Sequence, residues 1–193
     1  MLNAPLWGLA LAGGLSTRMG TDKGLIAWHG KPQREHLLDL FRQAELPACL
    51  SIRPDQMPKA LSTNCLIPDR YGAIGPAGAL RSAMEAYPGR AWLVIACDLP
   101  LVTVQFLQWL MQHRDPAMLF TGCATAFGPE PLAAIWEPAA GELLARFTDA
   151  GAYSLRRILE NQAVKIVAQP DSTTLLNANS PEDCTTIRQI LAV

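Results

Sequence analysis

Short apolar runs recur along the chain, separated by segments in which apolar residues return every three or four positions. Several runs are nearly continuous rather than alternating, which is typical of strands covered by other elements on both faces. We predict a strand at each of the following runs: Leu6 to Leu11, Ala48 to Ile52, Cys65 to Ile67, Trp92 to Cys97, Met118 to Thr121, Leu132 to Trp136 and Val164 to Ala168.

The segments between these runs have helical spacing. The apolar faces that repeat at helical intervals are Leu37/Leu38/Phe41/Ala44, Leu80/Met84/Tyr87 and Phe106/Leu107/Leu110/Met111. Each face is wide enough to bury one side of a helix against a sheet, and Thr103 can cap the third helix.

The start of the C-terminal helix is marked most clearly. Ser180 can cap it, Pro181 fits its first position, and Glu182 and Asp183 complement the helix dipole. The apolar stripe that we expect this helix to bury consists of Ile187, Ile190 and Leu191.

The alternation of strands and helices predicts the fold class. Such a chain forms an α/β domain with a mostly parallel sheet and helices on both faces. The length of 193 residues suits one domain, and neither a repeat nor a linker interrupts it. We therefore expect residues 1–193 to form a single doubly wound, Rossmann-like three-layer domain that binds its ligand at the carboxyl ends of the strands.

The charge balance restricts the possible partners. Lys and Arg together number 16 and Asp and Glu 17, so the net charge is −1. This balance excludes the broad basic surface with which proteins bind nucleic acid. No apolar segment reaches the ~18 residues of a membrane span, and no basic residue precedes Arg18 as it would in a signal peptide. We expect a cytoplasmic protein that binds neither nucleic acid nor membranes.

The cysteines and histidines show no pattern typical of metal or nucleophilic sites. The cysteines are widely spaced and form no C-x-x-C motif, so we interpret them as small buried residues of a reducing compartment. They are Cys49, Cys65, Cys97, Cys123 and Cys184. His29, His36 and His113 lack ligand or triad spacing, and we assign them no catalytic role.

The segment from Leu11 to Lys23 carries the most informative motif. It reads L-A-G-G-L-S-T-R-M-G-T-D-K and directly follows the first predicted strand. Gly13 and Gly14 let backbone N–H groups approach a ligand closely, while Arg18 and Lys23 can neutralise phosphate charge. The spacing matches neither a Walker A loop nor G-x-G-x-x-G. The loop therefore favours a nucleoside triphosphate, although paired glycines also occur in ordinary strand-to-helix turns.

This motif resembles the signature of the MobA-like nucleotidyltransferases, whose fold is that of the nucleotide-diphospho-sugar transferases. The resemblance implies that Leu11, Ala12 and Gly13 contact the base and sugar through their backbone, and that Gly14 belongs to the same nucleotide-binding loop. It also implies that the two cations of the motif contact the triphosphate and take part in catalysis.

An aspartate follows one of the buried strand patterns. Asp98 comes directly after Cys97, at the position where α/β sheets present ligands. Mg²⁺ in proteins typically takes one or two carboxylates plus phosphate oxygens. In the family that the motif resembles, the matching aspartate holds Mg²⁺ at the nucleotide, which makes Asp98 the predicted metal ligand and a catalytic residue. The alternative is that Asp98 caps the turn before Pro100.

A glycine-rich stretch opens the second predicted helix. Its residues Gly75 and Gly78 flank a proline, and helix N-terminal amides at this point suit an anionic or polar ligand. By the resemblance, Asp69 lies in the guanine nucleotide site, next to this stretch. Arg53, just past the second strand, matches a family position that reaches the nucleotide.

Two asparagines precede the C-terminal helix. The stretch that contains Asn177 and Asn179 resembles a family segment whose asparagines line the acceptor site. These asparagines can equally shape the turn before the Ser180 cap, and both roles are compatible.

The resemblance implies a GTP-dependent enzyme. It would transfer GMP from GTP to molybdopterin cofactor, release pyrophosphate and use Mg²⁺, and proteins that deliver the cofactor or receive it would be its partners. A related cytidylyl- or sugar-phosphate nucleotidyltransferase and a non-catalytic nucleotide-binding module remain alternatives. The glycine pair after Ala12 favours guanine, since the cytidylyl branch tends to read L-A-A-G there.

Overall fold

The computed structural model describes residues 3–13, 22–56, 65–126, 128–169, 171 and 173–192. Its centre is a seven-stranded sheet with the strand order β3-β2-β1-β4-β6-β5-β7. The strands are β1 (Leu6–Leu11), β2 (Ala48–Ile52), β3 (Leu66–Pro68), β4 (Ala91–Ala96), β5 (Phe120–Thr125), β6 (Gly128–Trp136) and β7 (Val164–Val167).

The sheet is mostly parallel. Strand β6 runs antiparallel to its neighbours β4 and β5, while the other neighbouring pairs are parallel. The predicted α/β fold class with a mostly parallel sheet is therefore confirmed. The bounds of β1 and β2 match the apolar runs, whereas β6 begins before Leu132 because β5 and β6 pair as a hairpin down to Thr125 and Gly128.

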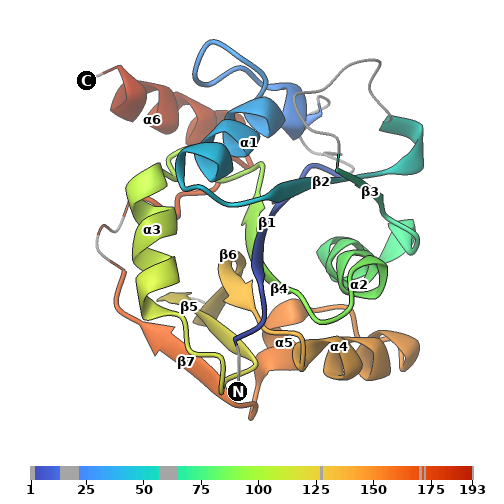
Figure 1. Ribbon diagram of the computed structural model, residues 1–193. Coiled ribbons are helices and arrows are strands. Elements are labelled where there is room, and N and C mark those ends of the chain that lie inside the picture. The colour runs from blue at the N-terminus through green and yellow to red at the C-terminus, as the bar shows by residue number, and fades with distance from the viewer. Residues whose placement is uncertain are drawn as a thin grey trace.

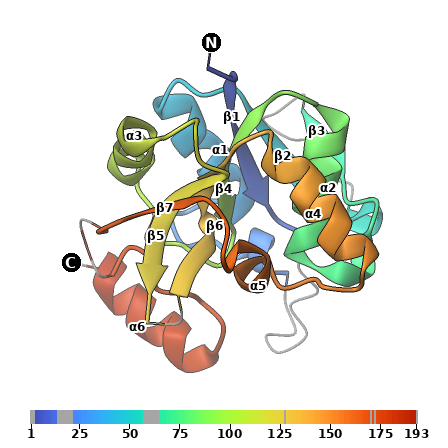
Figure 2. The ribbon, with the colours of Figure 1, turned by 90° about the horizontal axis from the view of Figure 1, so that it is seen from below.

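Two helix layers cover the sheet, as Figures 1 and 2 show. One layer contains α1 (Gln33–Gln43) and α3 (Val104–His113), and the other contains α2 (Pro76–Ala86), α4 (Ala140–Asp149) and α5 (Leu155–Leu159). Because side chains alternate along a strand, Leu9 packs toward the second layer and Ala10 toward the first. Each face of the sheet thus has its own apolar core.

The strand order reverses next to β1. The chain passes from β1 outward to β2 and β3 and then returns to place β4 on the other side of β1. In open α/β sheets, ligands bind at such a reversal, outside the carboxyl ends of the strands. These ends lie at the top of Figure 1, opposite the N-terminus of the chain. The topology therefore places the expected site between the ends of β1 and β4.

Helix α6 (Pro181–Leu191) lies at this same end of the molecule. Ser180 and Asp183 form the reciprocal hydrogen bonds of a capping box, which confirms the predicted helix start. The predicted stripe is wrong at Ile190, which is 38% exposed. The helix buries Cys184 and Ile187 against a small cluster with Leu101, so only a narrow face is covered.

The cysteine prediction is wrong for one pair. Cys49 and Cys65 form a disulfide, with their Cα atoms 4.6 Å apart. They are 16 positions apart in sequence, but β2 and β3 pair in parallel and bring them side by side. Linear spacing does not reveal such a pair. The remaining three cysteines are unpaired and buried, as predicted.

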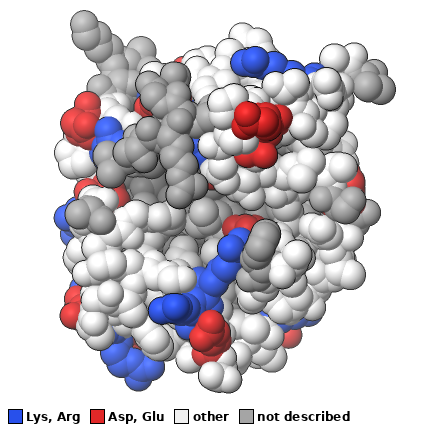
Figure 3. All heavy atoms as spheres, turned by 180° about the vertical axis from the view of Figure 1, so that it is seen from behind, with Lys and Arg blue, Asp and Glu red and all other residues white. Residues whose placement is uncertain are grey.

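The surface is mixed in charge. On the face shown in Figure 3, the described basic and acidic side chains lie in small groups close to one another. Within the described part of the chain, no helix is both long enough and apolar enough to cross a membrane.

Candidate active site

The ends of β1 and β4 bring the first motif next to Asp98. The two strands pair in parallel with Leu11 opposite Ala96, and the backbone N–H of Cys97 donates to the carbonyl of Leu11 at 3.1 Å. The first residues of the glycine loop and the aspartate therefore leave the sheet side by side. Gly14 and Arg18, which the sequence also assigns to the nucleotide site, lie outside the described residues.

Lys23 connects three distant segments of the chain. It begins a short 3-10 helix, η1 (Lys23–Leu25), whose first turn is capped by Asp22 through a 2.9 Å hydrogen bond from Gly24. The ammonium of Lys23 lies 3.5 Å from Asp98 Oδ2 and donates to the side-chain oxygen of Asn179. The structure thus gathers residues from the first motif, the end of β4 and the C-terminal asparagine segment.

Asp98 is mostly buried, with its side chain 19% exposed. Burial raises its pKa, and the nearby Lys23 partly offsets this effect. Its Oδ1 atom is buried and has no hydrogen-bond partner among the described residues. A buried carboxylate oxygen without a donor is costly, and a hard cation satisfies it. The residue therefore fits the role of a Mg²⁺ ligand.

The described residues contain no group of three or more His, Cys, Asp or Glu side chains that could hold a metal ion by themselves. A cation at Asp98 would complete its coordination with further oxygens, such as those of water or nucleotide phosphates. This is the usual situation for Mg²⁺ in phosphoryl transfer, where the nucleotide phosphates supply part of the coordination.

The two asparagines differ in where their side chains point. The backbone N–H of Ala178 donates to the carbonyl of Asp98 at 2.8 Å, which fastens the segment to the end of β4. Asn179 reaches Lys23, whereas the amide of Asn177 donates to the carbonyl of Leu175 at 3.3 Å. Asn179 therefore lies beside Lys23 and Asp98, and the side chain of Asn177 bonds within its own turn; the acceptor-binding role of both asparagines stays a prediction.

Asp69 also lies at the carboxyl ends of the strands, but after β3, at the outer side of the sheet. It follows β3, is 5% exposed, and its Oδ1 accepts hydrogen bonds at 2.9 Å from the backbone of Tyr71 and Gly72. Strands β2 and β1 separate it from β4, which at about 4.8 Å per strand places Asp69 roughly 14 Å from Asp98. An extended nucleotide can bridge such a distance, with its base near β3 and its phosphates near β4.

The two glycines of this stretch are required for different reasons. Gly75 has φ of 65° and ψ of −145°, a backbone conformation that residues with a Cβ rarely adopt. A Cβ on Gly78 would lie 2.8 Å from that of Tyr71 and 3.1 Å from Asp69 Oδ1. Both glycines thus shape the loop that carries Asp69, which the sequence pattern alone does not show.

Arg53 follows β2 and is held by a neighbouring acid. Its Nε and Nη2 atoms donate to the two carboxylate oxygens of Asp55, each at 2.9 Å. This hydrogen bond is the main cause of the raised pKa of Arg53. A Cβ on Gly13 would lie 3.4 Å from the backbone nitrogen of Arg53, so the arginine borders the glycine loop. Its contact with a nucleotide stays a prediction.

Comparison with known proteins agrees with this geometry. A family model described as the MobA-like NTP transferase domain matches residues 8–166. The chain belongs to this family. It is 32% identical over 182 residues to the "Molybdenum cofactor biosynthesis bifunctional protein" of Synechocystis sp., covering 93% of this chain but only 52% of that relative. The chain thus spans about half the length of that bifunctional protein.

Two further relatives are matched along almost their whole length. The "Probable molybdenum cofactor guanylyltransferase" of Trichormus variabilis is 28% identical over 187 residues, covering 95% of this chain and 90% of the relative. The crystal structure of "Molybdopterin-guanine dinucleotide biosynthesis protein A" from Archaeoglobus fulgidus superposes with a TM-score of 0.80 at 21% identity, covering 96% and 98% of the two chains. The second likeness shows that the MobA-like fold is shared.

Two features near the site were missed by the sequence analysis. Gln56 donates from its amide to Asp22 Oδ2 at 2.7 Å, which joins the segment after β2 to the turn that carries Lys23. His29 contacts the carbonyl of Pro100 at 2.9 Å and stacks on His36 with ring centroids 3.8 Å apart. We predicted no role for the histidines, because contacts between distant loops cannot be recognised from the spacing of residues along the chain.

Proposed function

We propose that the protein transfers GMP from GTP to molybdopterin cofactor and releases pyrophosphate. The observation that supports this most is the meeting of Lys23, Asp98 and Asn179, which come from the triphosphate, metal and acceptor motifs of the MobA-like family. The relatives named as molybdenum cofactor guanylyltransferases support the choice of base and acceptor.

In the proposed reaction, an oxygen of the acceptor phosphate attacks the α-phosphorus of GTP. A new P–O bond forms there while the bond from the α-phosphorus to the bridging oxygen of the β-phosphate breaks, and pyrophosphate leaves with that electron pair. No protein nucleophile or general base is required, because the acceptor phosphate is already ionised. The protein contributes position and charge.

Lys23 has the clearest role in this scheme. Two anionic groups must approach each other, and its ammonium, on a capped turn beside Asp98, offsets their repulsion and the charge of the departing pyrophosphate. By its place in the motif, Arg18 would add a second positive charge. A magnesium ion held by Asp98, when bound, would neutralise phosphate charge as a Lewis acid.

Asn179 would connect the acceptor to this charge centre. Its side-chain oxygen accepts from Lys23, which leaves its amide nitrogen to donate to an acceptor group. Asn177 would contribute by holding the turn. Proteins that deliver the cofactor or receive the product, and a cytoplasmic location where GTP is available, are part of the same proposal.

The test is a pyrophosphate-release assay with GTP, CTP, ATP and UTP in the presence of molybdopterin cofactor. We expect turnover with GTP and Mg²⁺ far above that with the other three nucleotides. Lys23→Ala should weaken GTP binding about ten- to hundred-fold, the usual effect of removing a charge-assisted contact. Lys165→Ala, on β7 away from the site, is the matched control.

Two outcomes would contradict the proposal. Preferential turnover of CTP would point to a cytidylyltransferase, and tight GTP binding with no turnover on any acceptor would point to a non-catalytic module. The asparagines are tested separately: Asn179→Ala should raise the acceptor KM without changing GTP affinity, whereas Asn177→Ala should lower the melting temperature with smaller kinetic effects.

A further inference from the structure

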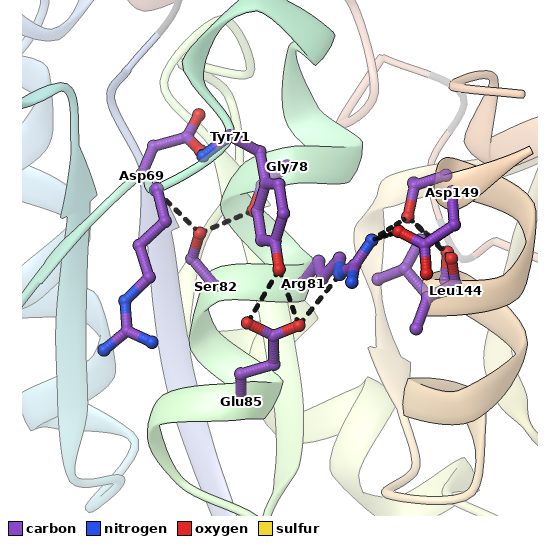
Figure 4. Close-up of polar contacts among 11 residues, drawn as sticks. Asp69, Tyr71, Gly78, Arg81, Ser82, Glu85, Leu144 and Asp149 are labelled. Carbon is purple, nitrogen blue, oxygen red and sulfur yellow. Dashed lines mark hydrogen bonds and ion pairs between the residues drawn. The ribbon is translucent and has the colours of Figure 1, made fainter. Parts of the chain in front are cut away.

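The turn that carries Asp69 is fastened to α2 by a chain of side-chain contacts, shown in Figure 4. It begins with the Asp69 carboxylate, of which only Oδ1 accepts hydrogen bonds from other described residues. The Oδ2 atom is therefore left as an acceptor for something else. Guanine presents an N1–H donor where adenine has an acceptor nitrogen, so the position of Oδ2 can discriminate between these bases.

Tyr71 extends this chain onto the surface of α2. Its backbone N–H donates to Asp69, and its hydroxyl donates to both oxygens of Glu85 at 2.8 and 2.9 Å. The hydrogen bond to Glu85 raises the pKa of the Tyr71 phenol, so the hydroxyl stays a donor. The residue that shapes the Asp69 turn is thus anchored at its far end.

Arg81 anchors the same residues a second time. Its guanidinium lies over the Tyr71 ring, 4.3 Å from the centroid, and its Nε donates to Glu85 at 2.8 Å. Its Nη1 donates to Thr148 at 2.8 Å and to Asp149 at 2.5 Å, both at the end of α4. The side chain is only 13% exposed, so these contacts are partly shielded from solvent. Helix α4 is thereby connected to the Asp69 turn.

A separate pair of hydrogen bonds holds the backbone beside Asp69. The N–H of Arg70 donates to the Ser82 hydroxyl at 2.9 Å, and that hydroxyl donates to the carbonyl of Gly78 at 2.8 Å. A Cβ on Gly78 would lie too close to Tyr71, so the two residues that follow Asp69 are both held against α2.

We propose that Tyr71 is a positioning residue for base selection, which acts through Asp69 and is held in place by Glu85 and Arg81. The inference rests on the proposed function, because it assumes that Asp69 faces the base of GTP. Tyr71 touches neither the phosphates nor the acceptor in this scheme. Its loss should therefore affect nucleotide recognition and leave the transfer step intact.

The test compares Tyr71→Phe with the wild-type enzyme. This variant keeps the ring under Arg81 but removes the hydrogen bond to Glu85. We expect the KM for GTP to rise about three- to ten-fold, less than the full loss of a charged hydrogen bond because Tyr71 acts on the base only through Asp69, with kcat nearly unchanged and with a smaller preference for GTP over ATP. Tyr153→Phe, at a tyrosine that is 46% exposed, is the matched control and should change neither value.

A double-variant cycle shows whether Tyr71 acts through Asp69. In an Asp69→Ala background, Tyr71→Phe should have no further effect on the GTP to ATP ratio. An equal effect in both backgrounds, or a melting temperature that falls with unchanged KM, would overturn the proposal. Glu85→Gln removes the charge at the far end of the chain and is expected to give a smaller rise in the KM for GTP, which provides a second measurement if Tyr71→Phe folds poorly.

The two proposals fail in different ways. A wild-type enzyme without preference for GTP would contradict the proposed function itself. A wild-type enzyme that prefers GTP, together with a Tyr71→Phe variant of unchanged preference, would contradict only the role of Tyr71.

Discussion

Buried polar side chains lie on both sides of β4, but they are paired differently. On the side of β6, Glu130 and Glu137 are 4% and 2% exposed. Glu130 accepts from Arg156 at 2.8 Å, and Glu137 accepts from Arg114 at 2.6 and 2.8 Å. Each buried charge on this side therefore has a guanidinium partner, as stability requires.

On the side of β1, several buried polar atoms have no hydrogen-bond partner within the described residues. They include Asp98 Oδ1, both amide atoms of Gln33, Arg34 Nε and Ser51 Oγ. Elsewhere, the indole nitrogens of Trp28 and Trp92 and the side-chain oxygen of Gln169 also lack partners. Most of the unmatched atoms thus surround the carboxyl ends of the strands and the first turn of α1.

This difference separates two kinds of buried polar group. Each unmatched group costs folding free energy of about 1 to 3 kcal/mol, whereas a matched pair avoids that cost. The matched charges beside β6 satisfy one another, so neither is left buried without a partner. The unpaired Oδ1 of Asp98 lowers the stability of the fold, but it can be paired by a bound ligand such as a cation. The same unpaired atom therefore favours binding.

The largest effect should come from Asp98→Asn. We expect pyrophosphate release to fall about 10²- to 10³-fold, the usual effect of removing one group that stabilises transition-state charge. The melting temperature should not fall, because the raised pKa means that the ionised carboxylate destabilises the folded state. Differential scanning fluorimetry beside the activity assay checks both, with Asp39→Asn on α1 as the control. A clear drop in stability would place Asp98 among the structural residues.

Breaking a matched pair should lower stability and leave activity intact. Arg114→Met leaves the Glu137 carboxylate buried and unpaired, so we expect the free energy of unfolding in urea to fall by about 3 to 5 kcal/mol. Turnover per folded molecule should stay unchanged. Arg114→Met combined with Glu137→Leu should recover most of the loss, since no charge is then left unpaired. Equal destabilisation by the single and double variants would disprove this explanation.

The disulfide between Cys49 and Cys65 should stabilise the β1 side of the sheet covalently. Closing a loop of this length contributes about 3 kcal/mol. We expect dithiothreitol to lower the urea midpoint of the wild-type protein toward that of Cys65→Ser, and to leave the variant itself unaffected. A wild-type midpoint that does not respond to reductant would show that the bond contributes nothing.

Replacing an unmatched group that has no ligand to bind should raise stability. Gln33 is fully buried, and neither atom of its amide has a partner among the described residues. Gln33→Leu should therefore increase the free energy of unfolding by about 1 to 3 kcal/mol. Gln43→Leu, at an exposed position of the same helix, should change it little. A Gln33→Leu variant with lower stability or lost activity would indicate that the amide has a functional partner.

The smallest effect concerns pH. Burial, followed by the neighbouring His29 and Lys31, lowers the pKa of His36 from 6.5 to about 4. Between these values the unfolded chain binds more protons than the folded one, so stability should fall as the pH drops from 6.5 to about 4 and then level off. For this half-buried ring we expect a loss of about 1 kcal/mol. In urea titrations at several pH values, the free energy of unfolding of His36→Gln should fall less between pH 6.5 and 4 than that of the wild type. The same dependence on pH in both proteins would rule out this contribution of His36.

The sequence by itself determined the parts of the protein that depend on neighbours in the chain. The continuous apolar runs predicted β1 and β2, and Ser180 with Asp183 predicted the start of α6, because strand burial and helix capping depend on local spacing. The motif from Leu11 to Lys23 indicated the MobA-like family, since its glycines and cations all belong to one loop.

Only the tertiary structure decided which distant residues meet. The disulfide, the contact between Lys23 and Asn179, and the connection from Asp69 through Tyr71 to α4 all depend on strand order and helix packing. Strand β4 lies on the opposite side of β1 from β2 and β3, and this strand order helps to bring residues more than a hundred positions apart into contact. No local sequence pattern encodes the strand order. The sequence therefore contained the chemical groups of the site, and the reversal of strand order next to β1 assembled them.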